Sequence, residues 1–191
     1  TRSALGLGAS VKVFDNSLSK LRRLQNDIGH RVYTSIIQPK ILEKAVKRAD
    51  VIIGAIRAPF GRTPCIVTEE MVAQMKPNSV IVDISIDQGG CFETSRITNH
   101  LTPTFKKHDV IHYCVPNIAS RVSRTASMAL SNIFSPLLLD MGNYGGCKEM
   151  IKRDPGFRSG VYIYKGKLTS QILGEVFTLP YKDIELLLAA L

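Results

Sequence analysis

Two aspartates and a glycine pair stand close together in residues 80–96, VIVDISIDQGGCFETSR. The stretch opens with an apolar run typical of a strand buried on both faces, expected over residues 80–86. Asp83 and Asp87 interrupt this run, and Gly89-Gly90 then marks a sharp turn or a close approach of the backbone. Open α/β sheets bind ligands at the carboxyl ends of their parallel strands. The sequence therefore predicts that Asp87 serves a ligand site, with a turn residue or helix N-cap as the alternatives.

A further carboxylate, Asp15, ends an expected strand over residues 9–14. In dinucleotide-binding folds, an acidic residue at the end of the second strand accepts hydrogen bonds from the adenosine ribose and favours NAD over NADP. The glycine-rich loop of such folds belongs about 20 residues earlier, and these residues contain no GxGxxG. Taken alone, a strand-end aspartate is more often a turn residue or cap, so its role depends on the elements around it.

Three other polar residues are weaker candidates for a functional role. His112 lies inside an expected strand over residues 110–115, where a hydrogen-bonded core histidine is favoured over a catalytic one. Asn117 follows that strand after a proline, at the level of Asp87 if the two strands are neighbours. Asp83 is interpreted as a buried, hydrogen-bonded structural carboxylate.

The elements that would position these residues alternate along the chain. Expected strands cover residues 9–14, 31–37, 50–56, 80–86 and 110–115, and expected helices cover residues 18–28, 39–48 and 69–75. This alternation predicts an α/β fold, a Rossmann-type parallel sheet with helices on both faces. Beyond a long loop at 88–107 and the last strand, a helix over 125–139 should kink or stop near Pro136. A polar, glycine-rich stretch at 141–159, a hairpin through Gly166 and two short helices follow.

Composition excludes some classes of protein and leaves others open. The net charge is +9, from 25 basic and 16 acidic residues, but the basic groups are scattered and aromatics are few, so nucleic-acid binding rests on charge alone. The four cysteines contain no CxxC pair, which argues against a zinc site and disulfides and fits a reduced cytosol. Cys91 and Cys114 are interpreted as small apolar fillers.

We find no apolar run long enough to span a bilayer and no signal peptide. The chain lacks an initiator methionine and is expected to begin part-way through a longer protein.

Four stretches together resemble alanine dehydrogenase, a family that includes transhydrogenase alpha subunits and saccharopine dehydrogenases. They are VIVDISIDQGGCFETSR, HYCVPN, SRTASMALSN and YKGKLTSQ. The similarity runs from residue 6 to about residue 178, and the Asp-Gln-Gly-Gly after the strand is absent from the transhydrogenase relatives. The resemblance implies NAD as cofactor and reversible oxidative deamination of L-alanine to pyruvate and ammonia. A transhydrogenase alpha-subunit-like protein, which needs a membrane partner, is the alternative.

The resemblance also implies roles for single residues. Asp87 would be catalytic, because it matches an aspartate that faces both the nicotinamide ribose and the substrate. The implied cofactor-binding positions are Asp15, Lys20, Ile56, Arg57, Ile84, Asp87, Val115, Asn117 and Ile118. Arg57 departs from the usual aliphatic residue, so only its backbone role carries over, and Ile118 replaces a frequent methionine. No metal is implied.

Domain organisation follows from the same resemblance. Residues 1–123 would be an N-terminally incomplete NAD-binding Rossmann-type domain, and residues 124–191 the C-terminal part of the substrate domain. The family's N-terminal half supplies the glycine-rich loop, an arginine and a lysine for the substrate, and an acid/base histidine, none of which is assignable here. We therefore expect the chain to carry mainly the cofactor half and to be inactive alone, with partial NAD binding as a further alternative. The family implies a cytoplasmic homo-oligomer, a hexamer, that takes L-alanine or pyruvate and no nucleic-acid or membrane partner.

Overall fold

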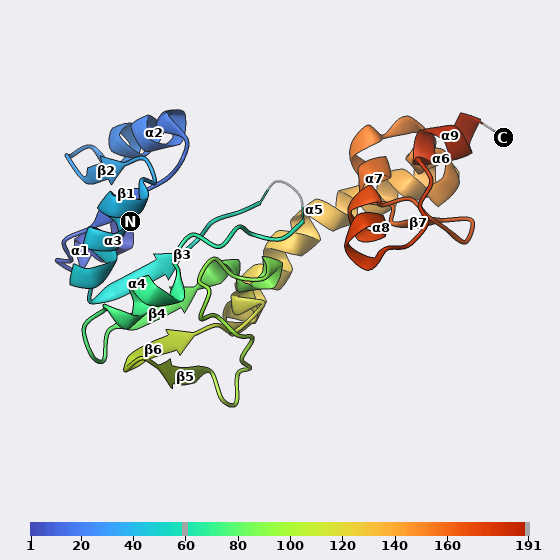
Figure 1. The fold of residues 1–191 in the computed structure, drawn as a ribbon. Coiled ribbons are helices and arrows are strands. Elements are labelled where there is room, and N and C mark those ends of the chain that lie inside the picture. Colours follow the sequence, from blue (N-terminus) through green and yellow to red (C-terminus); the bar gives the residue numbers. More distant parts are fainter. Residues whose placement is uncertain (59–60, 190–191) are drawn as a thin grey trace. The chain divides into compact units, whose positions relative to one another are not determined.

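The computed structural model describes residues 1–58 and 61–189, which form two compact units (Figure 1). The first unit covers Thr1–Arg57 and Arg62–Pro116. The second consists mainly of residues 117–189, together with Ala58 and Gly61. Each unit is described by itself.

The first unit alternates strands and helices. Its elements are α1 (Arg2–Gly6), β1 (Lys12–Phe14), α2 (Leu18–Ile28), β2 (Tyr33–Ser35), α3 (Pro39–Arg48), β3 (Val51–Gly54), α4 (Glu69–Ala73), β4 (Val80–Asp83), the 3-10 helix η1 (Ile84–Gln88), β5 (Thr104–Lys107) and β6 (Val110–Tyr113). Local chemistry sets several of these bounds. Ser17 Oγ accepts from Lys20 N–H at the start of α2, and Gly29 ends that helix with a φ of 78°. Pro39 occupies the first position of α3, where its missing N–H has no cost.

The strands of this unit form two sheets. Strands β1 and β2 pair in parallel, and a four-stranded sheet has the order β3-β4-β6-β5. Strands β3, β4 and β6 are parallel, which confirms the predicted α/β class, and β5 adds an antiparallel edge. The prediction of a loop throughout residues 88–107 is wrong at its end, because Thr104–Lys107 pairs with β6 through the short turn at His108 and Asp109. Strands β4 and β6 are neighbours, as the expected placement of Asn117 required.

One face of the four-stranded sheet is buried. Register partners point to the same face, and the side chains on this face, Ile81, Asp83, Val110, His112 and Cys114, are at most 1% exposed. Helices α3 and α4 cover it, because Leu42 and Val46 of α3 and Val72 of α4 join Ile81 and Val110 in one apolar cluster. The opposite face carries apolar side chains that are far more accessible, as Val51 at 56% and Ile53 at 58% show.

The second unit is mainly helical. Its elements are η2 (Ile118–Val122), α5 (Ser123–Asn143), α6 (Cys147–Arg153), α7 (Pro155–Ser159), β7 (Ile163–Tyr164), β8 (Lys167–Leu168), α8 (Gln171–Phe177) and α9 (Ile184–Ala189). Helix α5 runs through Pro136 to Asn143, so it does not stop at the proline. The turn around Pro136 is exposed, and water can bond the carbonyl that a proline leaves without its N–H partner. The stretch at 141–159 contains α6 and α7, which its polar composition did not indicate, whereas the hairpin through Gly166 is confirmed.

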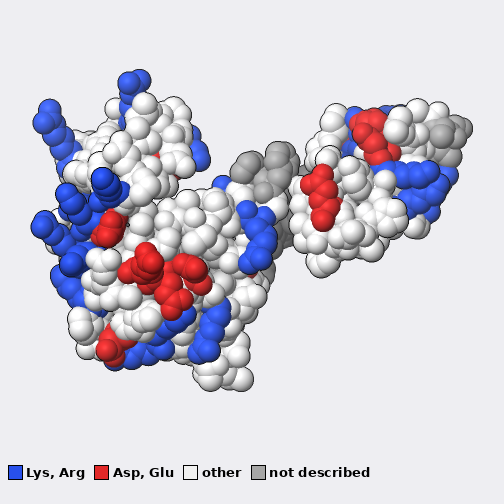
Figure 2. All heavy atoms as spheres, viewed as in Figure 1, with Lys and Arg blue, Asp and Glu red and all other residues white. Residues whose placement is uncertain are grey.

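Surface charge is mixed on the face drawn in Figure 2. Lys and Arg are densest there over the region of α2 and α3, and acidic side chains lie among them and on the second unit. Such interspersion is typical of a solvated surface and differs from a continuous basic stripe. Within residues 1–58 and 61–189, no helix combines the length and apolar character needed to cross a membrane.

Candidate functional site

Asp15 follows β1 and lies at the start of helix α2. Its Oδ1 accepts from Ser17 N–H at 2.8 Å, which fixes the carboxylate beside the helix N-terminus. A carboxylate has about four lone-pair sites, so this bond leaves capacity for further donors. Lys20 is exposed in the first turn of the same helix. Asp15 and Lys20 therefore both lie at the N-terminal end of α2, just after the carboxyl end of β1.

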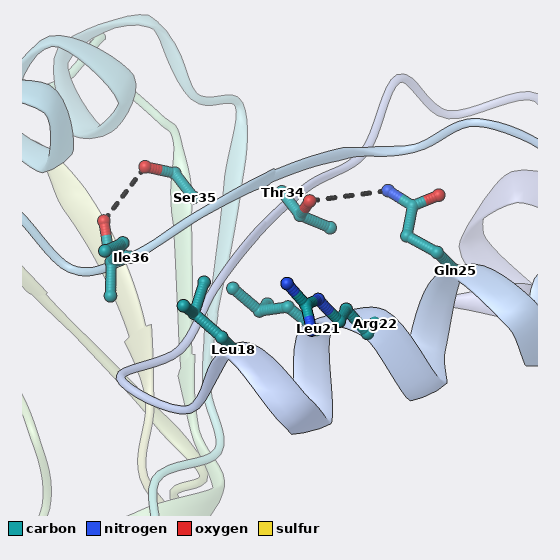
Figure 3. Close-up of a pocket in the computed structure, with 7 residues that line it drawn as sticks. All are labelled: Leu18, Leu21, Arg22, Gln25, Thr34, Ser35 and Ile36. Carbon is teal, nitrogen blue, oxygen red and sulfur yellow. Dashed lines mark hydrogen bonds between the residues drawn. The ribbon is translucent and has the colours of Figure 1, made fainter.

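A pocket of about 320 Å³ lies between α2 and the end of β2 (Figure 3). Gln25 Nε2 donates to Thr34 Oγ1 at 3.4 Å across it, and Ser35 Oγ donates to Ile36 O at 2.9 Å. The residues that line it are Leu18, Leu21, Arg22, Gln25, Thr34, Ser35 and Ile36. A volume of this size and a mixed apolar and polar lining suit part of a small-molecule ligand.

The strand expected over residues 80–86 ends earlier than the sequence indicates. Strand β4 stops at Asp83, and Ile84–Gln88 forms the 3-10 helix η1, so the expected strand through Ile86 is wrong. Asp83 caps this helix by accepting from Ser85 N–H at 3.0 Å. Gly89 ends it in the left-handed region, with a φ of 98°. The hydrogen bonds to the buried Asp83 carboxylate thus prevail over the β propensity of Ile84 and Ile86.

Asp83 anchors the whole loop after β4. Its side chain is 1% exposed, and Oδ2 accepts from Cys91 N–H at 3.0 Å and from Ser95 Oγ at 2.7 Å. Gly90 lies against it, since a Cβ there would be 2.6 Å from Asp83 Oδ2. The interpretation of Asp83 as a buried, hydrogen-bonded structural residue is confirmed, and Gly90 marks the close approach that the glycine pair indicated.

Cys91 completes the packing around Asp83. Burial raises the pKa of the Cys91 thiol to about 12, helped by the nearby Asp83 carboxylate, so the thiol stays protonated and donates to Asp83 Oδ1 at 3.7 Å. A Cβ on Gly54 of β3 would lie 2.4 Å from Cys91 Sγ, so only glycine fits there. Burial likewise raises the pKa of Cys114, which is 0% exposed. Both cysteines are buried fillers, as predicted.

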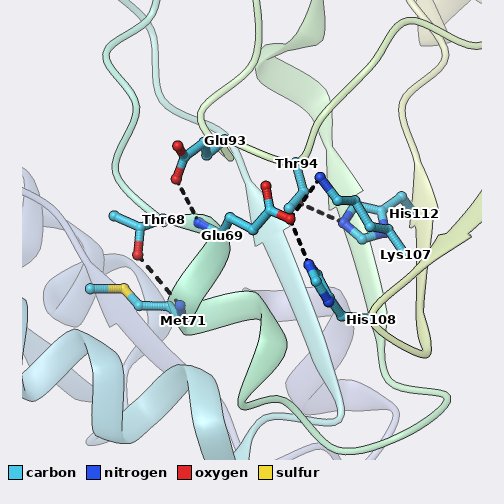
Figure 4. Close-up of polar contacts among 8 residues, drawn as sticks. All are labelled: Thr68, Glu69, Met71, Glu93, Thr94, Lys107, His108 and His112. Atoms are coloured by element: carbon cyan, nitrogen blue, oxygen red, sulfur yellow. Dashed lines mark hydrogen bonds and ion pairs between the residues drawn. The ribbon is translucent and has the colours of Figure 1, made fainter.

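Two further residues of the loop hold neighbouring elements (Figure 4). Glu93 Oε2 accepts from Glu69 N–H at 2.7 Å at the start of α4. Thr94 Oγ1 and His112 Nε2 are 2.8 Å apart, and His112 Nδ1 lies 3.1 Å from Val110 O. Because a carbonyl only accepts, Nδ1 carries the proton and Thr94 donates to Nε2. His112 is therefore the satisfied core histidine that was favoured.

Acid should destabilise the first unit through His112. Burial is the main cause that lowers the pKa of His112 below 6.5, and the nearby positive charges of Lys107, His108 and Arg96 lower it further. Below pH 6.5 the unfolded state therefore binds more protons at this site than the folded state, so stability is lost as pH falls from 6.5 toward the lowered value. Urea unfolding at pH 7.5 and pH 5 measures this effect. The free energy of unfolding should fall more between these two pH values in the native chain than in His112→Gln. An equal fall in both proteins would show that His112 is not the cause.

The loop anchored by Asp83 displays η1 at the carboxyl edge of the sheet. Ile84 is 42% exposed and Asp87 is exposed, whereas Ser85 and Ile86 between them are buried. Ser85 Oγ accepts from Ile56 N–H at 2.8 Å, which ties η1 to the segment that follows β3. Asp87 is thus held on a short, hydrogen-bonded helix, not at the strand end itself.

Three of the other predicted positions share this edge. Ile56 and Arg57 follow β3, and Val115 follows β6, and both strands are parallel neighbours of β4. Ile56 N–H is already bonded to Ser85, so a backbone contact from Ile56 to a cofactor would come from its carbonyl. The Arg57 side chain is exposed, and Val115 is 3% exposed, so its side chain packs inward.

The remaining two predicted positions begin the second unit. Asn117 has left-handed backbone angles, φ 51° and ψ 49°, and precedes η2. Ile118, the first residue of η2, is 36% exposed. The predicted residues therefore fall into three groups, at the end of β1, at the ends of β3, β4 and β6, and at the start of the second unit.

Arg62 is a neighbour of η1 that sequence reasoning missed. A Cβ on Gly89 would lie 2.7 Å from Arg62 Nε, and Thr63 N–H donates to Gln88 O at 2.8 Å. The guanidinium thus rests against the glycine that ends η1. The only signal in the sequence was the glycine pair. It indicates that another group approaches the backbone closely, but it does not identify that group as Arg62.

Comparisons of the sequence with known proteins identify its family. The family model "Alanine dehydrogenase/PNT, C-terminal domain" matches residues 1–171. An alanine dehydrogenase of Mycolicibacterium smegmatis is 43% identical over 188 residues, which are 98% of this chain and 50% of that protein. Alanine dehydrogenase 2 of Staphylococcus aureus (strain USA300) is 43% identical over 183 residues, 95% of this chain and 49% of that protein. The chain thus spans about half the length of the curated relatives it matches.

Solved structures show the same relationship. An L-alanine dehydrogenase superposes with a TM-score of 0.83 at 36% identity, covering 93% of this chain and 48% of that chain. The transhydrogenase from Sinorhizobium meliloti superposes with a TM-score of 0.63 at 24% identity, covering 73% of this chain and 40% of that chain, which shows a shared fold. The chain, with its Rossmann-type first unit, therefore belongs to the alanine dehydrogenase/PNT C-terminal domain family.

Proposed function

We propose that these residues are the cofactor half of an NAD-dependent alanine dehydrogenase. The reaction is L-alanine with NAD⁺ and water giving pyruvate, ammonium, NADH and a proton, and it runs in both directions. The observation that carries the proposal is the Asp83 network, because it holds the exposed Asp87 carboxylate at the carboxyl edge of a parallel sheet, where such sheets bind ligands. The relatives named alanine dehydrogenase support it.

Asp15 and Lys20 would bind the adenosine half of NAD. The carboxylate is oriented by Ser17 N–H and retains acceptor sites for the ribose hydroxyls. Its negative charge would repel the 2′-phosphate of NADP and so favour NAD. Lys20 adds a cation in the same helical turn.

Asp87 would act at the nicotinamide half, where the cofactor, when bound, accepts a hydride. In this role Asp87 accepts a hydrogen bond from the ribose and faces the substrate. As hydride leaves the Cα of alanine, its nitrogen becomes part of a cationic iminium, and a fixed carboxylate nearby stabilises that charge. Ile84, exposed on the same short helix as Asp87, would give an apolar surface that excludes water. Asn117 and Ile118, at the start of the second unit, are proposed as further cofactor-binding residues. The groups that bind the alanine carboxylate and move its proton come from outside these residues.

A chimeric enzyme tests the proposal. In it, this chain replaces the matched half of the M. smegmatis alanine dehydrogenase, and NADH formation is followed by absorbance with and without L-alanine. Alanine-dependent NADH formation is the expected result. Hydride exchange between nucleotides without alanine would favour the transhydrogenase alternative, and NAD binding without either reaction would favour a binding-only fragment.

Replacement of Asp15 should weaken NAD binding in the same chimera. Asp15→Ala removes charge-assisted hydrogen bonds to the ribose, which are worth about 1.5–3 kcal/mol, so the Kd for NAD should rise about 10- to 100-fold. The preference for NAD over NADP should shrink at the same time. Titration calorimetry with both nucleotides measures this, and Asp27→Ala, an exposed carboxylate on the same helix, is the matched control. Equal affinities in the two variants would remove Asp15 from the site.

We further propose a cytoplasmic homo-oligomer, with the second unit as the C-terminal part of a substrate domain. The expected division after residue 123 lies beyond Pro116, where the first compact unit ends. Support for assembly comes from α5, none of whose described residues is buried and whose Ile133 and Leu139 are 66% and 69% exposed. Support for a reducing compartment comes from the four cysteines, all of them free. A sedimentation measurement on the chimera would test assembly.

A further inference from the structure

The backbone just before Arg57 keeps the alternation of strand β3. At the start of the strand, Val80 N–H donates to Asp50 O at 2.9 Å. Six residues later, Ile56 N–H donates to Ser85 Oγ at 2.8 Å, on the same side of the chain. In an extended strand, the backbone groups of every second residue point to the same side. The period of two therefore continues to Ile56, and Arg57 is the next residue.

The side chain of Arg57 belongs to the uncovered face of the sheet. Ile52 and Ile56 both pack against the apolar cluster on the covered face. Successive side chains of an extended strand point to opposite faces, so Arg57 shares the face of Val51 and Ile53, which are 56% and 58% exposed. The Arg57 side chain is itself exposed. This face is thus apolar along β3 and carries a cation just beyond the carboxyl end of the strand.

Arg57 differs from other arginines of the chain in having no ion pair. Arg158 Nε pairs with Glu185 Oε1 at 2.8 Å, and the Arg96 guanidinium carbon lies 4.2 Å from the ring centroid of Phe105. Within residues 1–58 and 61–189, no carboxylate lies within salt-bridge distance of the Arg57 guanidinium. Its donors and its positive charge are therefore available to a ligand.

Arg57 lies between the two ends of the proposed cofactor site. Dinucleotide-binding sheets have the strand order 3-2-1-4-5-6 and bind the ligand beyond the carboxyl ends of the strands, where the order reverses. In this order β1, β3 and β4 take positions 2, 4 and 5, so the end of β3 lies between the ends of β1 and β4. Asp15 follows β1, and Asp87 follows β4 on η1. A dinucleotide that reaches from Asp15 to Asp87 therefore passes Arg57.

The diphosphate is the part of NAD that lies between its two nucleosides. It is negatively charged, and the planar guanidinium of an arginine can donate two parallel hydrogen bonds to phosphate oxygens. We propose that the Arg57 side chain binds the diphosphate of NAD. This role rests on the proposed cofactor site and adds a contact to it, because the aliphatic side chain that is usual at this position in relatives has no donor for a phosphate.

Neighbouring basic residues are less suited to this role. Lys20 lies in the first turn of α2, close in sequence to Asp15 and so at the adenosine end. Arg62 rests against the end of η1, because a Cβ on Gly89 would lie 2.7 Å from its Nε. Arg57 is therefore the cation that should make diphosphate binding depend on salt, since ions screen exposed charges.

Nucleotide titrations on the chimera test this contact without turnover. Arg57→Leu should raise the Kd for NAD and for ADP-ribose about tenfold, the loss expected for charge-assisted hydrogen bonds at an exposed site. The Kd for adenosine, which has no phosphate, should be unchanged. Arg57→Lys keeps the charge without the planar fork and should recover part of the loss. Raising NaCl from about 50 mM to about 500 mM should narrow the difference between the parent and Arg57→Leu.

Arg48→Leu is the matched control, because Arg48 is an exposed arginine that ends α3 just before the amino end of β3. An equal rise of the Kd in Arg48→Leu would show an effect of net charge and would overturn the proposal. So would an unchanged Kd for ADP-ribose in Arg57→Leu, or an equal loss of affinity for adenosine. A loss confined to NAD would place Arg57 at the nicotinamide and contradict a contact with the diphosphate.

NADH formation decides the proposed reaction separately. A parent chimera that binds ADP-ribose through Arg57 but does not oxidise alanine would overturn the reaction and support the diphosphate contact. An active chimera whose nucleotide affinities are unaffected by Arg57→Leu would do the reverse. A parent chimera that binds neither NAD nor ADP-ribose would contradict both.

Discussion

Asp87→Asn is expected to lower kcat/KM for alanine-dependent NADH formation in the chimera by about 10²- to 10³-fold, the range for loss of one preorganised electrostatic group. The substitution preserves the size of the side chain and its ability to accept one hydrogen bond, but it removes the negative charge. Because the iminium charge develops only as hydride leaves, kcat should fall more than KM rises. Steady-state kinetics with L-alanine and NAD as varied substrates measure both parameters.

The hydrogen bonds that hold the turn make this experiment specific to charge. Helix η1 is held by Asp83, Ser85 and Ile56, none of which Asp87→Asn alters. Asp109→Asn, in the exposed turn between β5 and β6, is a matched control and should leave the kinetics unchanged. Activity within about threefold of the parent chimera would show that the Asp87 charge does not act in the reaction. Loss of NAD binding without loss of kcat would place Asp87 in cofactor binding alone.

Hydropathy and turn chemistry predicted the α/β fold because the apolar runs are short and separated by clear caps. Helix α3 matches its predicted bounds because Pro39 is well suited to the first position of a helix, where its missing N–H has no partner to lose. The end of β4 was not predictable in the same way, since the isoleucines after Asp83 continue the strand pattern. Only the burial of Asp83, with the donors that reach it from Cys91 and Ser95, shows why the chain turns there.

The candidate site was predictable to the extent that it is local in sequence. Asp87 and the glycine pair lie within one motif, so their proximity could be inferred. Arg62 could not be identified, because it reaches Gly89 from a segment after β3 and basic residues are common in this chain. The division of the strands into two sheets also depends on pairing between distant residues, which periodicity does not encode.

Asp83→Asn should lower the free energy of unfolding of the first unit by about 2–4 kcal/mol. Each carboxylate oxygen of Asp83 accepts two hydrogen bonds. Ser85 N–H and the Cys91 thiol donate to Oδ1, and Cys91 N–H and Ser95 Oγ donate to Oδ2. An amide offers one oxygen, so its NH₂ group must face a buried N–H, whichever way it is turned. Two donors that face each other in the absence of water leave both unsatisfied, and the site is too tightly packed to admit water beside Gly90.

Urea unfolding, with amide exchange at Ile81 and Val110 as a monitor of the first unit, measures this loss. Asp109→Asn is again the control, because Asp109 is exposed and has a φ of 59°, a conformation that asparagine adopts readily. It should change stability by less than about 0.5 kcal/mol. Asp83→Asn should also release η1 from its anchor, so activity in the chimera should fall although Asp87 is intact. A stable Asp83→Asn protein with full activity would show that the turn does not depend on this carboxylate. Cofactor binding at Asp15, on the other sheet, should persist, which would separate a local loss of the turn from unfolding of the unit.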